Sequence, residues 1–327
     1  SESKSSKNPD ESSSTTITIQ ETKPKFKSAA DLIDQVAGVH IQHYGGSESS
    51  TAVSIRGSNS NQVNIFLDGV PLETSSGEGI GLGDLSSSGL RKIQVYKSQA
   101  PSEFGFTSMG PVISLSSLQA EKGLKQHYGL AYGSFQTWDV STQIGYGGEN
   151  YHLMGGLKYG RTKGSVSFLD NNGTPLNASD DSQVSRQNNH KSTLHPYIKW
   201  QYDFDQDYHL ELTQHFFRID SGVPGLQSFQ SQTASRDLTE WMSHVKLSRE
   251  NIFTDKMSYE NTVFWRVVKS QFSDPNGEIG LGAAQDNDNL TVLFGDRFHL
   301  VSNIHKRFKL TQTAAYTFES FSPKDYL

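Results

Sequence analysis

Three aspartates that lie close together in the chain are the clearest candidates for metal ligands. Asp170, Asp180 and Asp181 flank a stretch rich in Asn and Gly, SFLDNNGTPLNASDDSQ. Carboxylate and amide oxygens are ligands that calcium prefers, and a loop that concentrates them can hold this ion. The spacing is not that of an EF-hand, so solvated surface acids are the alternative. The sequence therefore predicts either a calcium site or a solvated acidic loop here.

The other residues that could do covalent chemistry form no catalytic pattern. The chain has no cysteine, which excludes disulfides, thiolate metal ligands and cysteine nucleophiles. Its 11 histidines are scattered without the HExxH spacing, and neither a GxSxG motif nor a phosphate-binding loop occurs. A net charge of -6 gives no basic field for nucleic acid. We therefore expect a protein that binds, and neither an enzyme nor a nucleic-acid partner.

Residues 28–118 have the pattern of a small α+β domain. Ser28 is the expected N-cap of a helix over Ala29–Val36, and Gly38 ends it. Asp68–Gly69 is a hairpin turn signal, because Gly adopts positive φ without strain. Short strands are predicted over residues 39–42, 52–56, 63–67, 93–97 and 112–115.

Residues 119–327 have a different pattern, with long segments in which apolar and polar residues alternate. Tyr208, Leu210 and Leu212 alternate with His209 and Glu211, and this period of two continues for ten or more residues in several segments. Globular strands are usually about five or six residues long, whereas a tilted strand that crosses a bilayer needs about 9–11. Short turns and long polar loops also alternate. The pattern predicts an antiparallel transmembrane β-barrel.

The motifs of the first domain resemble those of one family. The segments SAADLIDQVAGV, SIRG, QVNIFLDGVPL, LRKIQVYKSQAPSEFGF and MGPVISL follow one another between Ser28 and Leu115. In this order they resemble the plug domain of TonB-dependent outer-membrane receptors. The loop around Asp170, followed by SGVPG at Ser221–Gly225, is similar to the loop after the third strand in cobalamin and siderophore receptors, some of which bind calcium near this place.

The resemblance implies a bacterial outer-membrane receptor that imports a scarce, bulky nutrient such as a ferric siderophore or cobalamin. The receptor captures its ligand, and the energising protein TonB then rearranges the plug. The implied partners are TonB with its inner-membrane complex, the ligand, and outer-membrane lipid. A receptor or scaffold that captures glycans or signals without transport is the alternative function.

The resemblance also implies a segment for TonB near the N-terminus. Residues 1–27 are expected to be disordered, apart from an alternating β-branched peptide that is suited to adding a strand to another protein's sheet. A first edge strand or a linker is the alternative. The predicted TonB box consists of Thr15, Thr16, Ile17, Thr18, Ile19 and Gln20.

Further site residues follow from the same resemblance. Arg56 of SIRG is the expected latch between plug and barrel, although Gln94 stands where the family usually has the Glu of an ion pair with it. The alternative for Arg56 is a static buried ion pair. Ligand contacts are expected from the apices of two plug loops, at His43, Tyr44, Gly45, Glu48, Thr74, Ser75, Ser76 and Glu78.

The number of strands predicts that the chain is a part of its receptor. The alternating segments amount to about nine strands, whereas the family closes its barrel with 22. A complete barrel of eight to ten strands is the alternative, but side chains fill a lumen of that size and leave no room for a plug. We therefore expect the N-terminal part of a longer receptor.

Overall fold

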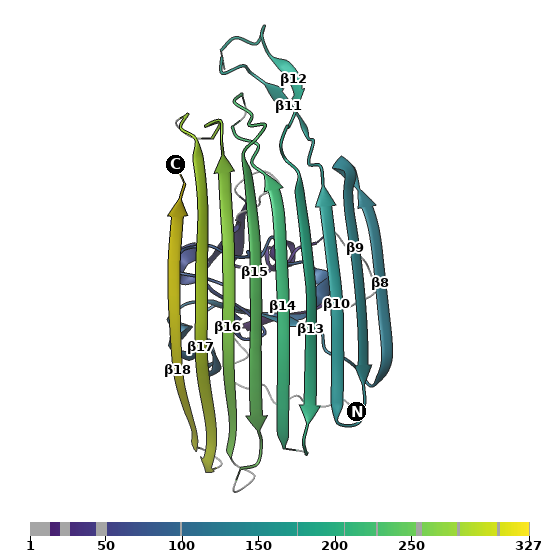
Figure 1. Ribbon diagram of the computed structural model, residues 1–327. Coiled ribbons are helices and arrows are strands. Elements are labelled where there is room, and N and C mark those ends of the chain that lie inside the picture. Colours follow the sequence, from purple (N-terminus) through teal and green to yellow (C-terminus); the bar gives the residue numbers. More distant parts are fainter. Residues whose placement is uncertain are drawn as a thin grey trace.

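The computed structural model describes residues 14–19, 27–43, 51–98, 100–174, 176–205, 207–226, 228–252, 257–279, 282–305 and 308–326. Two parts are present. The described residues between 14 and 118 form a small domain that we call the plug. The nine long strands that follow form one curved antiparallel sheet that we call the wall. Figure 1 shows the plug, in purple to blue, behind the wall at mid-height.

The plug is built on a five-stranded sheet in the order β1-β6-β7-β4-β5 and a separate two-stranded sheet, β2-β3. Among the described strands of the plug, only β4 and β7 pair in parallel. Short 3-10 turns lie at Ser60–Gln62, Ser87–Gly89 and Ser102–Met109. The elements are β1 (Ser14–Thr18), α1 (Ala29–Ile33), β2 (Val39–His43), β3 (Thr51–Ile55), β4 (Asn64–Leu67), β5 (Val70–Pro71), β6 (Leu90–Tyr96) and β7 (Val112–Ser117).

The predicted start of α1 is confirmed, and its end differs. The Ser28 side chain accepts from the Asp31 amide while the Asp31 carboxylate accepts from the Ser28 amide, a reciprocal capping box. The helix ends at Ile33 rather than Val36, because the amide of Val36 donates to Ile33 at 2.9 Å in a tighter turn.

Several further boundaries in the plug differ from the prediction; β6, for example, covers residues 90–96 instead of 93–97. β1 pairs with β6 from Ser14↔Tyr96 to Thr18↔Lys92, so the plug sheet includes a strand that precedes residue 28. Strand β3 ends at Ile55, one residue before the predicted Arg56. Arg56 instead has a φ of 52° and begins a turn.

The wall contains nine strands, as the alternating segments predicted. They pair in the order β18-β17-β16-β15-β14-β13-β10-β9-β8, each with its neighbour along the chain apart from an inserted hairpin. They range from 11 to 21 residues in length. The strands are β8 (Gly123–Gly133), β9 (Thr137–Gly147), β10 (Tyr151–Thr162), β13 (Lys191–Asp203), β14 (Tyr208–Gly222), β15 (Ser235–Arg249), β16 (Met257–Asp274), β17 (Gln285–His305) and β18 (Phe308–Asp325).

The connections between these strands differ at the two ends of the wall. At one end the connections are short, at residues 148–150, 204–207 and 250–256; at the other, long connections span residues 163–190, 223–234 and 275–284. A 3-10 turn, Ser134–Gln136, joins β8 to β9 at the long-loop end. The first long connection also contains a hairpin that the sequence did not predict, formed by β11 (Ser167–Asp170) and β12 (Ser182–Ser185). It rises above the wall (Figure 1).

The two faces of the wall have opposite character. Along β14, Glu211 and Thr213 are buried toward the plug, while Leu212 between them is 37% exposed on the outer face. The outer face also exposes Trp138, Trp241 and Phe294 on other strands. An apolar, aromatic-rich face of this kind is what lipid requires, whereas the inner face carries polar groups. Among the described residues, no helix is long and apolar enough to cross a membrane.

The plug and the wall share one hydrophobic core. Plug side chains such as Ile80 and Leu82 belong to the same buried cluster as Phe217, Met242 and Phe264 of the wall. Burial of apolar surface contributes roughly 25 cal/mol per Å². The plug is therefore held in place by apolar contact as well as by the polar groups described next.

Candidate functional site: the plug–wall interface

The centre of the interface is the β4–β5 hairpin of the plug. Asp68 and Gly69 form its two-residue turn, with φ of 49° and 83°. Positive φ at both central positions is the geometry of a type I′ turn, which matches the twist of paired strands. The hairpin prediction is confirmed, and the turn also carries the Asp68 carboxylate to the inner face of the wall.

Asp68 is held from both domains. Within the plug, its Oδ1 accepts from the Ser117 amide at 2.9 Å and its Oδ2 from the Ser117 hydroxyl at 2.6 Å. From the wall, Lys199 Nζ lies 3.1 Å from Oδ1, and His215 Nε2 lies 3.2 Å from Oδ2. The side chains of Asp68, Lys199 and His215 are 4%, 2% and 1% exposed. A buried carboxylate at this position needs such partners.

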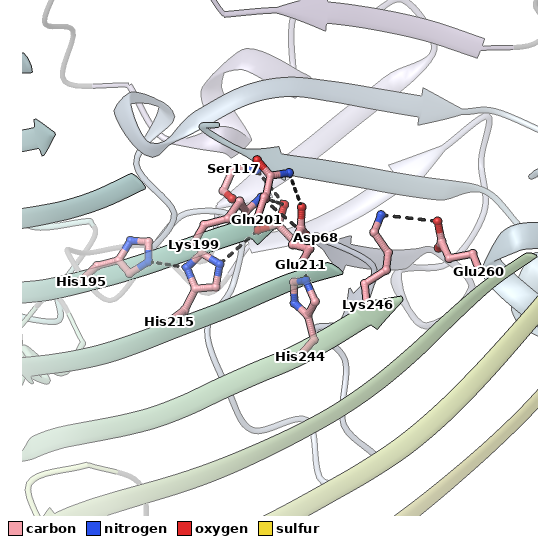
Figure 2. Close-up of polar contacts among 10 residues, drawn as sticks. All are labelled: Asp68, Ser117, His195, Lys199, Gln201, Glu211, His215, His244, Lys246 and Glu260. Atoms are coloured by element: carbon pink, nitrogen blue, oxygen red, sulfur yellow. Dashed lines mark hydrogen bonds and ion pairs between the residues drawn. The ribbon is translucent and has the colours of Figure 1, made fainter. Parts of the chain in front are cut away.

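The contact continues along the wall in two directions, which Figure 2 shows. Toward the long-loop end, His215 Nδ1 lies 3.0 Å from His195 Nε2, and the His195 ring stacks on Phe217 with centroids 3.9 Å apart. Toward the short-turn end, Lys199 lies 3.9 Å from Glu211. Glu211 in turn accepts from His244 at 3.0 Å and from Gln201 at 2.8 Å. A more exposed pair, Lys246 and Glu260, lies beyond it at 3.4 Å.

The partners of Asp68 determine the protonation state of its carboxyl group. Burial by itself would raise the pKa of the carboxyl, but Lys199 and His215 outweigh burial and hold the pKa of Asp68 well below its usual range. Asp68 is therefore ionised at neutral pH, and its contact with Lys199 is a charged pair.

A second buried pair lies nearer the long-loop end. Arg266 of β16 and Glu240 of β15 are both fully buried and are joined by two hydrogen bonds, at 2.6 and 3.0 Å. Both also contact plug backbone. Arg266 Nη1 donates to the Leu72 carbonyl at 2.6 Å, and Glu240 Oε2 accepts from the Ile80 amide at 3.0 Å. The pair therefore links the plug segment between Leu72 and Ile80 to the wall.

A cavity of about 360 Å³ lies between plug and wall on the long-loop side. His195 lines it, so the cavity lies at the end of the chain of contacts that leads to Asp68. Two ion pairs also line it. Asp84 of the plug pairs with Lys191 of the wall at 2.7 Å, and Asp139 pairs with Lys158 within the wall. The lining of the cavity mixes these charged groups with apolar side chains such as Leu194, Phe217 and Ile219.

The predicted ligand residues of the second plug loop lie against the wall. Ser75 donates from its amide and hydroxyl to Glu319 at 2.9 and 2.7 Å, and Ser76 contacts Thr291 at 3.1 Å. Glu78 accepts from Asn289 at 3.3 Å, while Thr74 donates to the Glu78 carbonyl at 2.7 Å within the loop. These contacts fix the loop in place, and ligand contact by these four residues stays a prediction.

Other predicted site residues are placed apart from this interface. Arg56 is exposed, and its amide donates to Gly38 at 2.8 Å; its role as a latch stays a prediction. Of the predicted TonB box, Thr15 to Thr18 lie in β1, and Ile19 follows this strand. The segment is thus an edge strand of the plug, which was the alternative prediction for it. His43 ends β2. Gln20, Tyr44, Gly45 and Glu48 lie outside the described residues.

The predicted calcium ligands already have hydrogen-bond partners. Asp180 accepts from the Thr174 hydroxyl at 2.7 and 2.9 Å, and Asp170 accepts from the Ser228 hydroxyl at 2.7 Å. In the part of the chain that the structure describes, no group of three or more His, Asp or Glu side chains is arranged to hold a metal ion. Calcium binding, which would also involve Asp181, stays a prediction.

The residues of the two buried clusters were not predicted as a site. Glu211 was expected only as a polar residue of an alternating strand, and no role was predicted for Lys199, His215, Arg266 or Glu240. One signal was available, because VFWRVV and LTEWM place a charge among large apolar residues. Charged side chains in such a setting are almost never buried unless they are paired.

A family model supports the assignment of the plug. Residues 7–112 match the family described as the TonB-dependent receptor plug domain. The chain carries a TonB-dependent receptor plug domain. The family resemblance of the motifs between Ser28 and Leu115 is confirmed by this match.

Solved structures of TonB-dependent receptors share the whole fold. The copper transporter OprC covers 95% of this chain with a TM-score of 0.74 and 14% identity. The FrpB iron transporter from Neisseria meningitidis covers 97% with a TM-score of 0.76 and 14% identity, and the ferripyoverdine receptor of the outer membrane of Pseudomonas aeruginosa covers 97% with 0.71 and 16%. At this identity the likeness shows the fold, a plug domain followed by antiparallel barrel strands, as predicted.

The matched structures are longer than this chain. The chain spans 47%, 50% and 44% of the three receptors, which is about half of their length. In this TonB-dependent receptor fold, the wall corresponds to a part of the barrel and the clusters around Asp68 and Arg266 lie between that part and the plug domain.

Proposed function

We propose that this chain belongs to a bacterial outer-membrane receptor that imports a scarce, bulky nutrient by ligand capture and TonB-driven rearrangement of the plug. In this proposal the wall spans the outer membrane, the long-loop end faces outward, and the plug blocks the passage until TonB acts. Integral placement in the outer membrane agrees with the apolar outer face of the wall.

The observation that carries the proposal is the buried ionic docking of the plug. Withdrawal of the plug would separate Asp68 from Lys199 and His215, and it would break the hydrogen bonds that Arg266 and Glu240 form with the plug backbone. It would also expose the apolar core that plug and wall share. A plug held in this way requires an external energy source, which is the role proposed for TonB.

The position of β1 supports the same proposal. β1 is an edge strand of the plug sheet and pairs on one side only, with β6. An extended edge segment is suited to β-augmentation by a partner protein, in which main-chain hydrogen bonds supply the affinity. We propose that residues 15–20 are the TonB box and that force applied there reaches β6 and the plug sheet.

We further propose a ferric siderophore or cobalamin as the nutrient. The neighbours named as an iron transporter and a ferripyoverdine receptor favour the siderophore. Capture is proposed at the long-loop end, by the loops that carry residues 43–48 and 74–78 and by the cavity beside His195. A calcium ion in the loop of Asp170, Asp180 and Asp181 would order that loop.

The test measures binding and uptake separately in an outer membrane. Cells that produce the full-length protein receive radiolabelled cobalamin or one of a panel of ferric siderophores. The test variant lacks residues 15–20, and the control variant lacks residues 4–9, which shortens the N-terminal segment equally. We expect saturable uptake that is lost in the test variant and kept in the control, with surface binding unchanged in both.

Two outcomes would contradict the proposal in different ways. Binding without uptake in the unmodified protein would identify a receptor or scaffold that does not transport, which is the second candidate. Loss of both binding and uptake in the test variant would show that residues 15–20 are needed for folding, and the TonB box assignment would be rejected.

A further inference from the structure

A second cavity lies at the rim of the wall, where β9, β10 and β13 reach the long-loop end. Its volume is about 720 Å³. The whole chain has more Asp and Glu than Lys and Arg, 35 against 29, yet the described residues of this lining include three Lys or Arg side chains, one His and no carboxylate. The remaining groups are mostly amides and hydroxyls. The lining residues are Gln136, Trp138, Arg161, Thr162, Lys163, Ser165, Ser185, Arg186, Gln187, Asn188, Asn189 and His190.

This basic pocket is continuous with the outer face of the wall. Trp138 and Arg161 are direct cross-strand partners between β9 and β10, and both are exposed. The next outward pair toward the short-turn end is Val140↔Tyr159, and each of these side chains is 37% exposed. The basic pocket therefore lies directly above apolar outer surface. Tryptophan and tyrosine at this height match the aromatic girdle at a membrane–water boundary.

A smaller hollow of about 530 Å³ adjoins the basic pocket and shares Gln136, Lys163 and Ser165 with it. Its other lining residues include Tyr132 and Phe135, which are 61% and 50% exposed. The combined surface thus has a cationic part and an aromatic part side by side.

The backbone around the basic pocket is held by hydrogen bonds within the protein, and of the basic groups named here only the Arg186 guanidinium takes part. Lys163 donates its amide to Phe135 at 3.1 Å, Arg186 donates its amide to Val166 at 2.7 Å, and the Asn189 side chain donates to Gly164 at 2.6 Å. The Arg186 guanidinium donates to the Gly225 carbonyl. A site ordered in advance binds at a lower cost in entropy.

The charges of the basic pocket are largely unneutralised. Among the described residues, no carboxylate forms an ion pair with Arg161, Lys163 or Arg186. His190 is the exception, since its Nε2 lies 3.7 Å from Asp220. Guanidinium and ammonium groups that lack an acidic partner favour an anionic ligand, and phosphate matches the guanidinium geometry well.

We propose that the basic pocket binds the phosphate of a phosphorylated membrane glycolipid, with the acyl chains on the apolar outer face below. This inference rests on the proposed location in an outer membrane. A lipid is favoured over free phosphate because Trp138 lines the pocket and Val140 and Tyr159 continue from it along the exposed outer face, an apolar surface that a free anion would not use. Arg161 and Lys163 contact the phosphate, and Tyr132 and Phe135 cover the adjoining sugar.

The test measures lipid binding by the purified full-length protein in detergent, with native mass spectrometry as the readout. The probes are bis-phosphorylated lipid A, the same lipid after chemical removal of its phosphates, and inorganic phosphate as a competitor. The test variant is R161A/K163A. The control is K269A/K324A, which removes two positive charges from the outer face at the same end of the wall, on β16 and β18.

We expect the unmodified protein and the control to retain bis-phosphorylated lipid A and to bind the dephosphorylated lipid more weakly. In R161A/K163A the affinity for the phosphorylated lipid should fall roughly 10- to 30-fold, since each basic group near such a surface contributes about a factor of five. Equal binding of both lipids, or an unchanged affinity in the test variant, would overturn the proposal. Displacement by inorganic phosphate at low millimolar concentration would show a free-anion site and would also overturn it.

These results are independent of nutrient import. The measurement contains neither nutrient nor TonB, so a receptor that fails to transport can still bind the lipid. Conversely, a negative lipid result leaves uptake by the unmodified protein unchanged.

Discussion

Asp68 and Lys199 are separated by 131 positions in the chain, yet Asp68 Oδ1 and Lys199 Nζ lie 3.1 Å apart. One residue belongs to a plug hairpin and the other to β13 of the wall. Both side chains are almost completely buried, and the Ser117 hydroxyl and His215 Nε2 contact the other carboxylate oxygen, Oδ2. The distance between these two side chains therefore reports whether the plug is docked against the wall.

Neutralising Asp68 should loosen the plug. D68N removes the nearer carboxylate partner of buried Lys199 and leaves only Glu211, at 3.9 Å, and removal of one partner from a buried pair costs about 3–5 kcal/mol. We expect the urea concentration at which a protease cleaves the plug to fall accordingly. In the double variant D68N/K199M the loss should be smaller than the sum of the two single losses, because the buried ammonium group is removed together with its nearer partner.

The control for this measurement is the Lys246–Glu260 pair, whose side chains are 35% and 37% exposed. Solvent screens a half-exposed pair more than a buried one, so K246M should lower protease resistance less than D68N. Equal effects of D68N and K246M would show that burial does not increase the contribution of the Asp68 pair to protease resistance.

The contribution of Asp68 should depend on pH in one direction. Its carboxyl has a pKa well below the usual range, so it stabilises the docked plug above the unfolded pKa of about 4 and stops doing so as the pH falls through the folded value. The difference in protease resistance between the unmodified protein and D68N should be constant from pH 8 to pH 5 and shrink below pH 4. A difference that disappears between pH 7 and pH 5 would assign the effect to histidines instead.

Arg266 should hold the plug segment between Leu72 and Ile80. R266M removes the donor to the Leu72 carbonyl and leaves Glu240 buried without its cation, at a cost of about 3–5 kcal/mol. Hydrogen exchange of the amides from Leu72 to Leu82 should accelerate. In R266M/E240L exchange should be slower than in R266M, since no unpaired charge remains. The amides of α1, which Arg266 does not contact, provide the internal control.

Glu278 should link the long connection 275–284, to which it belongs, to the connection 223–234. Its Oε2 accepts from Ser231 Oγ at 2.7 Å and from the amides of Gln232 and Thr233 at 2.9 Å, and these bonds lower the pKa of Glu278 to about 2. E278A should therefore make the 223–234 connection more sensitive to protease without changing plug docking. E250A, in a short connection at the other end of the wall, is the matched control. Unchanged cleavage in E278A would show that other contacts order the connection.

Much of the fold could be predicted from local patterns. The capping box at Ser28 and the turn at Asp68–Gly69 depend on residues within a few positions of each other, and both are present. The nine wall strands follow from alternation, because successive side chains of a strand point to opposite faces. By the same rule, Lys199, Glu211 and His215 share the face opposite to the apolar side chains next to them.

Only the tertiary structure decided which of these inward groups meet. A period of two specifies the face of a strand, but the partner across the interface depends on the curvature of the wall and the position of the plug. Asp68 thus pairs with Lys199 and His215, while Arg56, the expected latch, is exposed. The sequence by itself determined the elements and their faces, and the docking of two separately patterned domains determined the buried clusters, because their contacts join residues far apart in the chain.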